Sequence, residues 1–215
     1  MAASREYQDA QDLESFLATT TGERGISAML LSSPQILYWT LSRGGGHDRY
    51  VFREFPLGSR YKVDFVVLNS YSGSWQVNFI ELEPVDCRPL TKSGVPSARL
   101  AGALKQVEDW ADYFSNNKEQ VRADLVRWAK EKDILGYSNR SEPCNFSGQF
   151  LAHPSTYISD HYTIFVGRRE MLEAQQQKQK ARYTQRYNVE VASYDRLLDL
   201  VRDRYKNKEF WLRDA

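Results

Sequence analysis

The segment that decides the fold is YKVDFVVLNSYSGSWQVNFIELE, residues 61–83. Residues 61–68 and 75–83 are rich in β-branched and aromatic side chains, and Pro84 ends the second run. Between them, the Asn, Ser and Gly of residues 69–74 are typical of a hairpin loop. The segment therefore predicts two antiparallel strands, and residues 50–55 predict a further strand before a turn at 56–59.

The rest of the chain alternates helical and strand patterns. Ahead of the strands we expect a helix over 10–18, two short helices between 23 and 42 interrupted by Ser33-Pro34, and a loop at residues 44–46. After the strands we expect a helix capped by Ser97 and ending near 114, and a helix over 118–132. A loop over 136–149 then precedes strands at 162–166 and 188–192 and helices at 168–182 and 194–205. This order predicts an α/β sandwich around one mixed sheet.

Composition excludes several classes of protein. The chain has 215 residues, 41% of them hydrophobic, and no run of the roughly 18 apolar residues that would predict a membrane span. Two cysteines are too few for a disulfide framework or a zinc ribbon, and the polar first thirty residues do not resemble a signal peptide. We therefore expect a cytoplasmic protein that makes no membrane contact.

Net charge is +1, so any nucleic-acid surface must come from local clustering. One basic cluster lies between residues 168 and 186, which contain six basic residues and only two acidic ones, Glu170 and Glu173. Its bases are Arg168, Arg169, Lys178, Lys180, Arg182 and Arg186. The cluster fits either a solvated helix face or a contact with a phosphate backbone.

Three acids mark the candidate chemistry. Glu81 and Glu83 are two residues apart on a predicted strand, so both side chains leave the same face. Asp64 lies on the neighbouring hairpin strand, which can bring it beside them. Carboxylates this close repel each other unless a cation lies among them, and Mg²⁺ and Mn²⁺ prefer such oxygen ligands. The alternative is that Glu81 and Glu83 form the polar face of an edge strand.

These residues resemble a known family. Residues 58–68 and 79–84 resemble the Asp…Glu-x-Lys signature of the PD-(D/E)XK nuclease superfamily, and more closely the Shedu family of bacterial anti-phage nucleases. The likeness continues through residues 90–94, 103–110, 165–169 and 191–198, and spans about 25 to 205. It implies a restriction-endonuclease-like fold, with a mixed sheet flanked by helices. The implied nuclease domain covers residues 25–215, after an N-terminal extension at 1–24.

The resemblance also implies roles around the metal. Asp64 and Glu81 would bind Mg²⁺ or Mn²⁺, with the Leu82 carbonyl as a third ligand. Glu83 departs from the family pattern, because it occupies the position where most of the superfamily has a lysine. A carboxylate there cannot stabilise developing negative charge as a cation does. It can instead bind a second metal ion or act as a general base.

Four further residues carry implied roles. Gln106 would orient a metal ligand or the attacking water, unless it is an ordinary helix-surface glutamine. Lys92 would supply the missing positive charge, unless it is a solvated loop lysine. Arg168 and Arg169 would guide the nucleic-acid backbone.

The implied activity is metal-dependent endonucleolytic cleavage of phosphodiester bonds, with DNA as the expected nucleic acid. A homo-oligomer is expected, because a double-strand break requires two sites, and a separate sensor or defence partner could regulate the chain. Two other functions stay open. The first is a catalytically silent nuclease-fold module that binds nucleic acid or a partner protein, which the replacement of lysine by Glu83 favours. The second is an unrelated α/β interaction domain, in which Asp64 and Glu81 would lie far apart.

Overall fold

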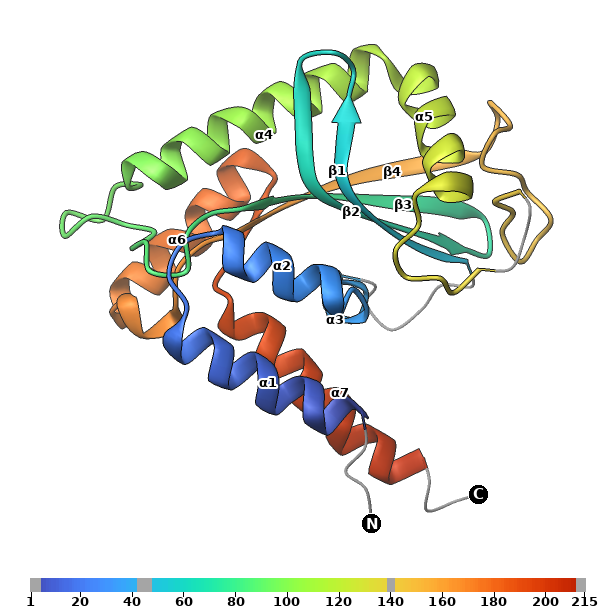
Figure 1. Ribbon diagram of the computed structural model, residues 1–215. Coiled ribbons are helices and arrows are strands. Elements are labelled where there is room, and N and C mark those ends of the chain that lie inside the picture. Colours follow the sequence, from blue (N-terminus) through green and yellow to red (C-terminus); the bar gives the residue numbers. More distant parts are fainter. Residues whose placement is uncertain (1–4, 42–47, 139–141, 212–215) are drawn as a thin grey trace.

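The computed structural model describes residues 5–41, 48–138 and 142–211, and the side chains among residues 11–203 of these ranges (Figure 1). Strands and helices alternate along the chain in the order that the sequence predicts. The elements are α1 (Arg5–Thr19), α2 (Arg24–Ser32), α3 (Gln35–Leu41), β1 (Arg49–Leu57), β2 (Tyr61–Tyr71), β3 (Ser74–Leu82), α4 (Ala98–Asn116), α5 (Lys118–Glu131), β4 (Tyr157–Phe165), a 3₁₀ turn (Arg169–Met171), α6 (Ala174–Tyr187), β5 (Glu190–Ala192) and α7 (Asp195–Trp211).

One mixed sheet organises the described part of the chain. Its strand order is β1-β2-β3-β4-β5, with β1, β2 and β3 antiparallel and β3, β4 and β5 parallel. Helices α4 and α5 cover one face, and α1, α2, α3 and α7 lie on the other (Figure 1). The predicted α/β fold, a mixed sheet flanked by helices, is therefore confirmed.

Each face of the sheet has its own hydrophobic core, because side chains alternate along every strand. On the first face Phe79 packs against Phe114 of α4, with ring centroids 5.8 Å apart. On the second face Ile80 packs in a cluster with Leu30 of α2 and Leu197 of α7. Adjacent residues of β3 thus point into different cores, which fixes the face on which each polar residue of β3 lies.

Several element boundaries differ from the prediction. β1 continues through Pro56, which an edge strand tolerates because its outer N–H groups need no partner in the sheet. The predicted hairpin loop at 69–74 is wrong, because β2 and β3 extend until only residues 72 and 73 connect them. β4 begins at Tyr157, earlier than expected, and the predicted loop at 44–46 lies outside the described residues.

Side-chain caps set the first residues of α4 and α6. α4 begins as predicted, because Ser97 Oγ accepts a hydrogen bond from the Leu100 N–H at 3.3 Å. The prediction that a helix begins at residue 168 is wrong. A 3₁₀ turn comes first, and α6 starts only after Glu173, where Gln176 Oε1 accepts a hydrogen bond from the Glu173 N–H at 3.2 Å.

The first helix belongs to the second core. α1 runs alongside α7, and Leu13 and Leu17 of α1 are buried in the cluster that α7 also fills (Figure 1). Leu13 and Leu17 belong to the predicted N-terminal extension at 1–24, and they therefore contribute buried side chains to the folded unit. Among the described helices, none combines the length and apolar character needed to cross a membrane.

Candidate active site

The acids meet where β2 and β3 part. Phe65 pairs with Ile80 in the antiparallel register, so one further step places Asp64 opposite Glu81 on the same face. Asp64 Oδ2 accepts a hydrogen bond from the Leu82 N–H at 2.8 Å. In an extended strand the N–H and C=O of one residue point to the same side, so the Leu82 carbonyl lies on the edge that faces Asp64. The carboxylates of Asp64 and Glu81 and this carbonyl therefore lie at one end of the sheet.

Helix α4 supplies a fixed partner for Glu81. Gln106 Nε2 donates a hydrogen bond to Glu81 Oε2 at 2.9 Å, and both side chains are half-buried. The bond leaves the other carboxylate oxygen of Glu81 free of this contact. Gln106 thus lies where the sequence places it, although its predicted role as an orienter stays a prediction.

The electrostatics of the three acids show that they crowd one another. Burial, followed by repulsion from Asp64 and Glu83, raises the pKa of Glu81 to about 9. Burial also raises the pKa of Asp64, against a lowering by its hydrogen bond from the Leu82 N–H. Carboxyl groups with pKa values raised in this way are destabilised when ionised, and a divalent cation would stabilise the ionised form.

Glu83 differs from the other two acids because a cation lies near it. Burial raises its pKa to about 7, while the positive charge of Arg99 at the start of α4 opposes the rise. Glu83 is 7% exposed, and its Oε2 has no hydrogen-bond partner within the described part of the chain. Its backbone is held on both sides, because its N–H donates to the Phe165 carbonyl at 2.8 Å and its carbonyl accepts from the Tyr194 hydroxyl at 2.7 Å.

A cavity of about 470 Å³ opens beside Asp64. Its walls carry both acidic and basic side chains and come from the start of α2, the middle of β1, the start of β2 and the end of β3. Its lining residues are Glu23, Arg24, Ser27, Arg53, Glu54, Lys62, Asp64 and Leu82. Glu23 and Glu54 therefore bring two more acids to the site, and Glu23 raises the pKa of Asp64, Glu81 and Glu83 in turn. From the sequence, either one could supply an additional acid, but no spacing assigns a role to Glu23 or to Glu54.

The donor set fits Mg²⁺ or Mn²⁺. Within the described residues, no three side chains of His, Cys, Asp or Glu form a preassembled metal-binding group. Mg²⁺ does not require one, because it keeps several waters and is held by one or two carboxylates together with substrate oxygens. Asp64, Glu81 and the Leu82 carbonyl are oxygen donors of that kind, and the mutual repulsion of the carboxylates favours a cation between them.

The structure does not bring Lys92 to this cavity. Lys92 is exposed and lines a different pocket, with Arg88 and Gly94 on one side and Gln176 and Gln179 of α6 on the other. The positive charge near Glu83 comes from Arg99 instead, which sequence reasoning missed. The loop that connects Glu83 to α4 brings Arg99 there, and no local sequence pattern predicts the course of that loop.

Arg168 and Arg169 are held by acids of α7. Arg168 Nη2 lies 2.9 Å from Asp195 Oδ1, and its Nη1 donates to the Leu17 carbonyl at 2.7 Å. Arg169 pairs with Asp199, and its side chain stays 56% exposed. Arg168 therefore joins α1 to α7, while the nucleic-acid contacts predicted for both residues stay predictions.

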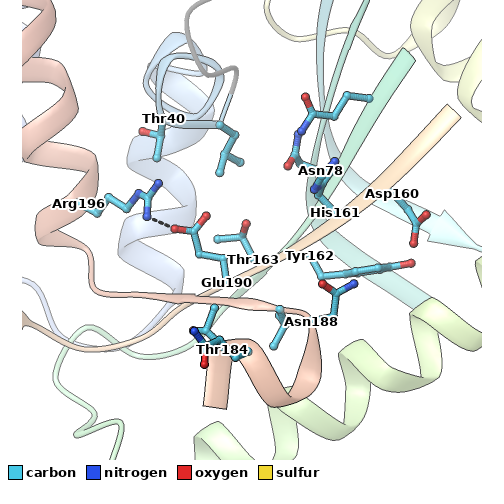
Figure 2. Close-up of a pocket in the computed structure, with 14 residues that line it drawn as sticks. Thr40, Asn78, Asp160, His161, Tyr162, Thr163, Thr184, Asn188, Glu190 and Arg196 are labelled. Atoms are coloured by element: carbon cyan, nitrogen blue, oxygen red, sulfur yellow. Dashed lines mark hydrogen bonds and ion pairs between the residues drawn. The ribbon is translucent and has the colours of Figure 1, made fainter. Parts of the chain in front are cut away.

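A second polar cavity, of about 370 Å³, lies at the other end of β3 and includes residues of the opposite face (Figure 2). Figure 2 shows Asn78 and His161 on one side and the ion pair of Arg196 and Glu190 on another. Asn78 is 4% exposed, and its Nδ2 has no hydrogen-bond partner within the described residues. The walls of this cavity carry amides and hydroxyls together with two carboxylates, Asp160 and Glu190. Glu190 is paired with Arg196, so a cation of the protein already balances its charge.

A comparison with known protein families gives a match that covers most of the chain. The family described as Shedu protein SduA, C-terminal, matches residues 20–198. The chain belongs to the Shedu family. Shedu membership suggests a role in anti-phage defence, and it confirms the resemblance found in the sequence. No curated protein matches this Shedu chain.

Proposed function

We propose that this Shedu chain is a metal-dependent endonuclease that hydrolyses phosphodiester bonds of DNA in anti-phage defence. The observation that carries the proposal is the position of Glu81 at the end of β3. There it lies opposite Asp64 and accepts a hydrogen bond from Gln106 at 2.9 Å. β3 is the central strand of the sheet, so Glu81 does not lie on the polar face of an edge strand, and a half-buried amide holds its carboxylate.

Asp64, Glu81 and the Leu82 carbonyl would hold Mg²⁺ or Mn²⁺ at this end of the sheet. Such an ion polarises a phosphoryl oxygen and lowers the pKa of a bound water. Gln106 keeps the Glu81 carboxylate in one orientation through its hydrogen bond. The Leu82 N–H does the same for Asp64, so both side chains are positioned before substrate arrives.

Glu83 is the group that accepts the proton of the attacking water. Its pKa of about 7 leaves a large fraction ionised at neutral pH and still basic enough to take a proton. The water oxygen forms a bond to phosphorus while its proton passes to Glu83. The bond from phosphorus to the leaving sugar oxygen breaks, and that oxygen takes up a proton from solvent. Arg99 limits the rise in the pKa of Glu83, which keeps the carboxylate available as a base.

The test is cleavage of supercoiled plasmid with Mg²⁺ or Mn²⁺, comparing the wild type with Glu81→Gln and Glu108→Gln. Glu108 lies on the exposed surface of α4, so its variant controls for the loss of one charge. We expect metal-dependent cleavage by the wild type and by Glu108→Gln, and a loss of at least about 10²-fold in Glu81→Gln. Full cleavage by Glu81→Gln would refute the assignment.

A second function is favoured by one observation, the absence of a preassembled three-side-chain metal group within the described residues. With Glu83 in place of the usual lysine, a silent nuclease-fold module would bind nucleic acid or a partner without hydrolysis. Titration calorimetry with Mn²⁺ separates the two functions. Binding that Asp64→Asn weakens at least about tenfold supports the nuclease. Absent binding, or binding equal in the variant, supports the silent module.

A further inference from the structure

Glu54 adopts an unusual backbone conformation beside the candidate metal site. Its φ is 55°, although it lies within strand β1. The β1–β2 pairing includes Arg53 with Phe65 and Phe55 with Val63, yet omits Glu54, which this register places opposite Asp64. Left-handed backbone is uncommon for a residue other than glycine, and such outliers cluster at ligand clamps and active sites.

The Glu54 carboxylate pairs with two cations. Its Oε1 lies 3.6 Å from Lys62 Nζ and 3.8 Å from Arg53 Nη2. Arg53 Nε is buried and has no hydrogen-bond partner within the described part of the chain. Both cations line the same cavity as Asp64, so they are held beside the acid that would bind the metal.

Charge in the cavity favours an anion once a divalent ion is present. Arg24, Arg53 and Lys62 line its walls against Glu23, Glu54 and Asp64. The cations and acids that line the cavity balance, and Glu81 beside it adds one negative charge, so a bound Mg²⁺ with its two positive charges would still leave an excess of positive charge. The planar guanidinium of Arg53 and the ammonium of Lys62 both suit phosphate oxygens. A nucleic-acid phosphate is therefore the anion that fits this position.

We propose that Arg53 and Lys62 form a phosphate-binding site for the nucleic-acid backbone, and that Glu54 occupies both cations until the phosphate displaces it. This inference rests on the proposed nuclease function, because it places the site beside the metal ligands. It predicts effects of opposite sign. Loss of a cation weakens nucleic-acid binding, and loss of the competing Glu54 carboxylate strengthens it. A merely structural ion pair would show no such reversal.

The experiment measures binding of a fluorescently labelled DNA duplex of about 20 base pairs by anisotropy. Ca²⁺ replaces Mg²⁺, because it takes the same oxygen ligands with looser geometry. Affinity is measured at several salt concentrations between about 0.05 and 0.2 M. A plot of log affinity against log salt concentration has a negative slope, and each lost phosphate contact makes that slope shallower by about 0.9. At about 0.1 M salt, this corresponds to a roughly eightfold loss of affinity. We expect these losses in Arg53→Gln and in Lys62→Gln, and several-fold tighter binding in Glu54→Gln.

A matched control is available in Lys130. Its Nζ lies 3.7 Å from Glu142 Oε1, close to the 3.6 Å of the Lys62–Glu54 ion pair, and Lys130 does not line the cavity. Lys130→Gln should bind the duplex with the slope of the wild type. Thermal unfolding of all variants shows whether the fold is kept, which the exposure of Lys62 and Lys130 favours.

The outcomes separate this inference from the proposed function. Arg53→Gln and Lys62→Gln that bind with the wild-type slope overturn the phosphate site, even if the wild type cleaves plasmid with Mg²⁺. Weaker or unchanged binding by Glu54→Gln overturns the competition by Glu54. The expected slopes with no cleavage under Mg²⁺ or Mn²⁺ support the phosphate site and count against hydrolysis. A wild type that binds no duplex overturns both.

Discussion

Strand β3 directs acidic side chains to one face of the sheet and amide side chains to the other. The buried polar groups of the two faces have different surroundings. Glu81 points toward α4, where Gln106 meets it. Asn78, an odd number of residues earlier, points to the opposite face and lines the cavity of Figure 2. Both interrupt a strand whose other residues are largely apolar, so each requires a physical explanation.

The difference between the two faces is one of charge. On the carboxylate face, burial and mutual repulsion raise the pKa of Glu81 and Asp64, so ionisation is penalised unless a cation arrives. On the amide face, the Nδ2 of Asn78 and both amide atoms of Asn69 lack partners within the described residues, and this cost involves no charge. Water can satisfy neutral amides, whereas only a counter-ion can satisfy crowded carboxylates.

Metal addition should separate the faces most strongly. Mg²⁺ or Mn²⁺ at about 100 times its dissociation constant should raise the free energy of unfolding of the wild type by about 2.7 kcal/mol. Glu81→Gln should lose this response. It should also be more stable than the wild type in chelator, because a carboxyl whose pKa is raised to about 9 must take up a proton to be buried at neutral pH, and a neutral amide need not. Thermal unfolding with and without metal measures both effects. An equal metal response in Glu81→Gln would place the ion elsewhere.

The hydrogen bond between Gln106 and Glu81 should matter next. Gln106→Leu removes the donor and leaves Glu81 free to rotate, so we expect metal affinity and cleavage to fall by about 10–100-fold. Gln120→Leu is the matched control, because Gln120 makes a similar contact to Asp124 at 3.2 Å on exposed α5. Calorimetry with Mn²⁺ measures the affinity. If Gln106→Leu and Gln120→Leu bind Mn²⁺ with equal affinity, Gln106 contributes to packing and does not orient Glu81.

Much of the carboxylate face could be predicted from sequence because strand geometry is local. Residues two apart share a face, which relates Glu81 to Glu83, and a hairpin register carries the argument across to Asp64. The helical spacing of α4 likewise turned Gln106 toward the sheet. The length of the hairpin loop was predicted wrongly, because Asn69 and Ser70 look like turn residues yet are buried in β2.

The partners that arrive through loops could not be assigned from the sequence. Arg99 and Glu23 reach the acids from different segments, and their positions depend on how the chain returns to the sheet. The same reason explains Lys92, whose place in the loop suggested proximity to Glu83 although the structure turns it toward α6. The conformation of Glu54 leaves no trace in composition either, because nothing in its neighbours requires a positive φ.

The amide face should tolerate what the carboxylate face does not. Asn69 is fully buried with both amide atoms unpartnered among the described residues. Asn69→Leu keeps a similar volume and removes two unsatisfied groups, so we expect the free energy of unfolding to rise by about 1–2 kcal/mol. Plasmid cleavage should stay unchanged. Urea denaturation measures the gain, and a destabilised variant would show that water or a ligand satisfies the amide in solution.

The smallest expected effect concerns Asp195, a carboxylate that is paired with a cation of the protein, unlike Asp64 and Glu81. Burial raises the pKa of Asp195, but hydrogen bonds from Arg168 and from the Arg169 N–H outweigh it, so the pKa is lowered overall. A carboxyl with a lowered pKa stabilises the fold above its unfolded pKa of about 4, and this contribution is lost as the pH falls through the folded value.

Asp195→Asn should therefore be less stable than the wild type by about 1 kcal/mol at neutral pH, and the two should converge in acid. Asp199→Asn is the control, because Asp199 pairs with Arg169 in the open, with side chains 44% and 56% exposed, and such pairs contribute little. Urea midpoints between about pH 2 and pH 7 measure the difference. A gap between Asp195→Asn and the wild type that persists in acid would mean that shape and not charge holds α7 at this position.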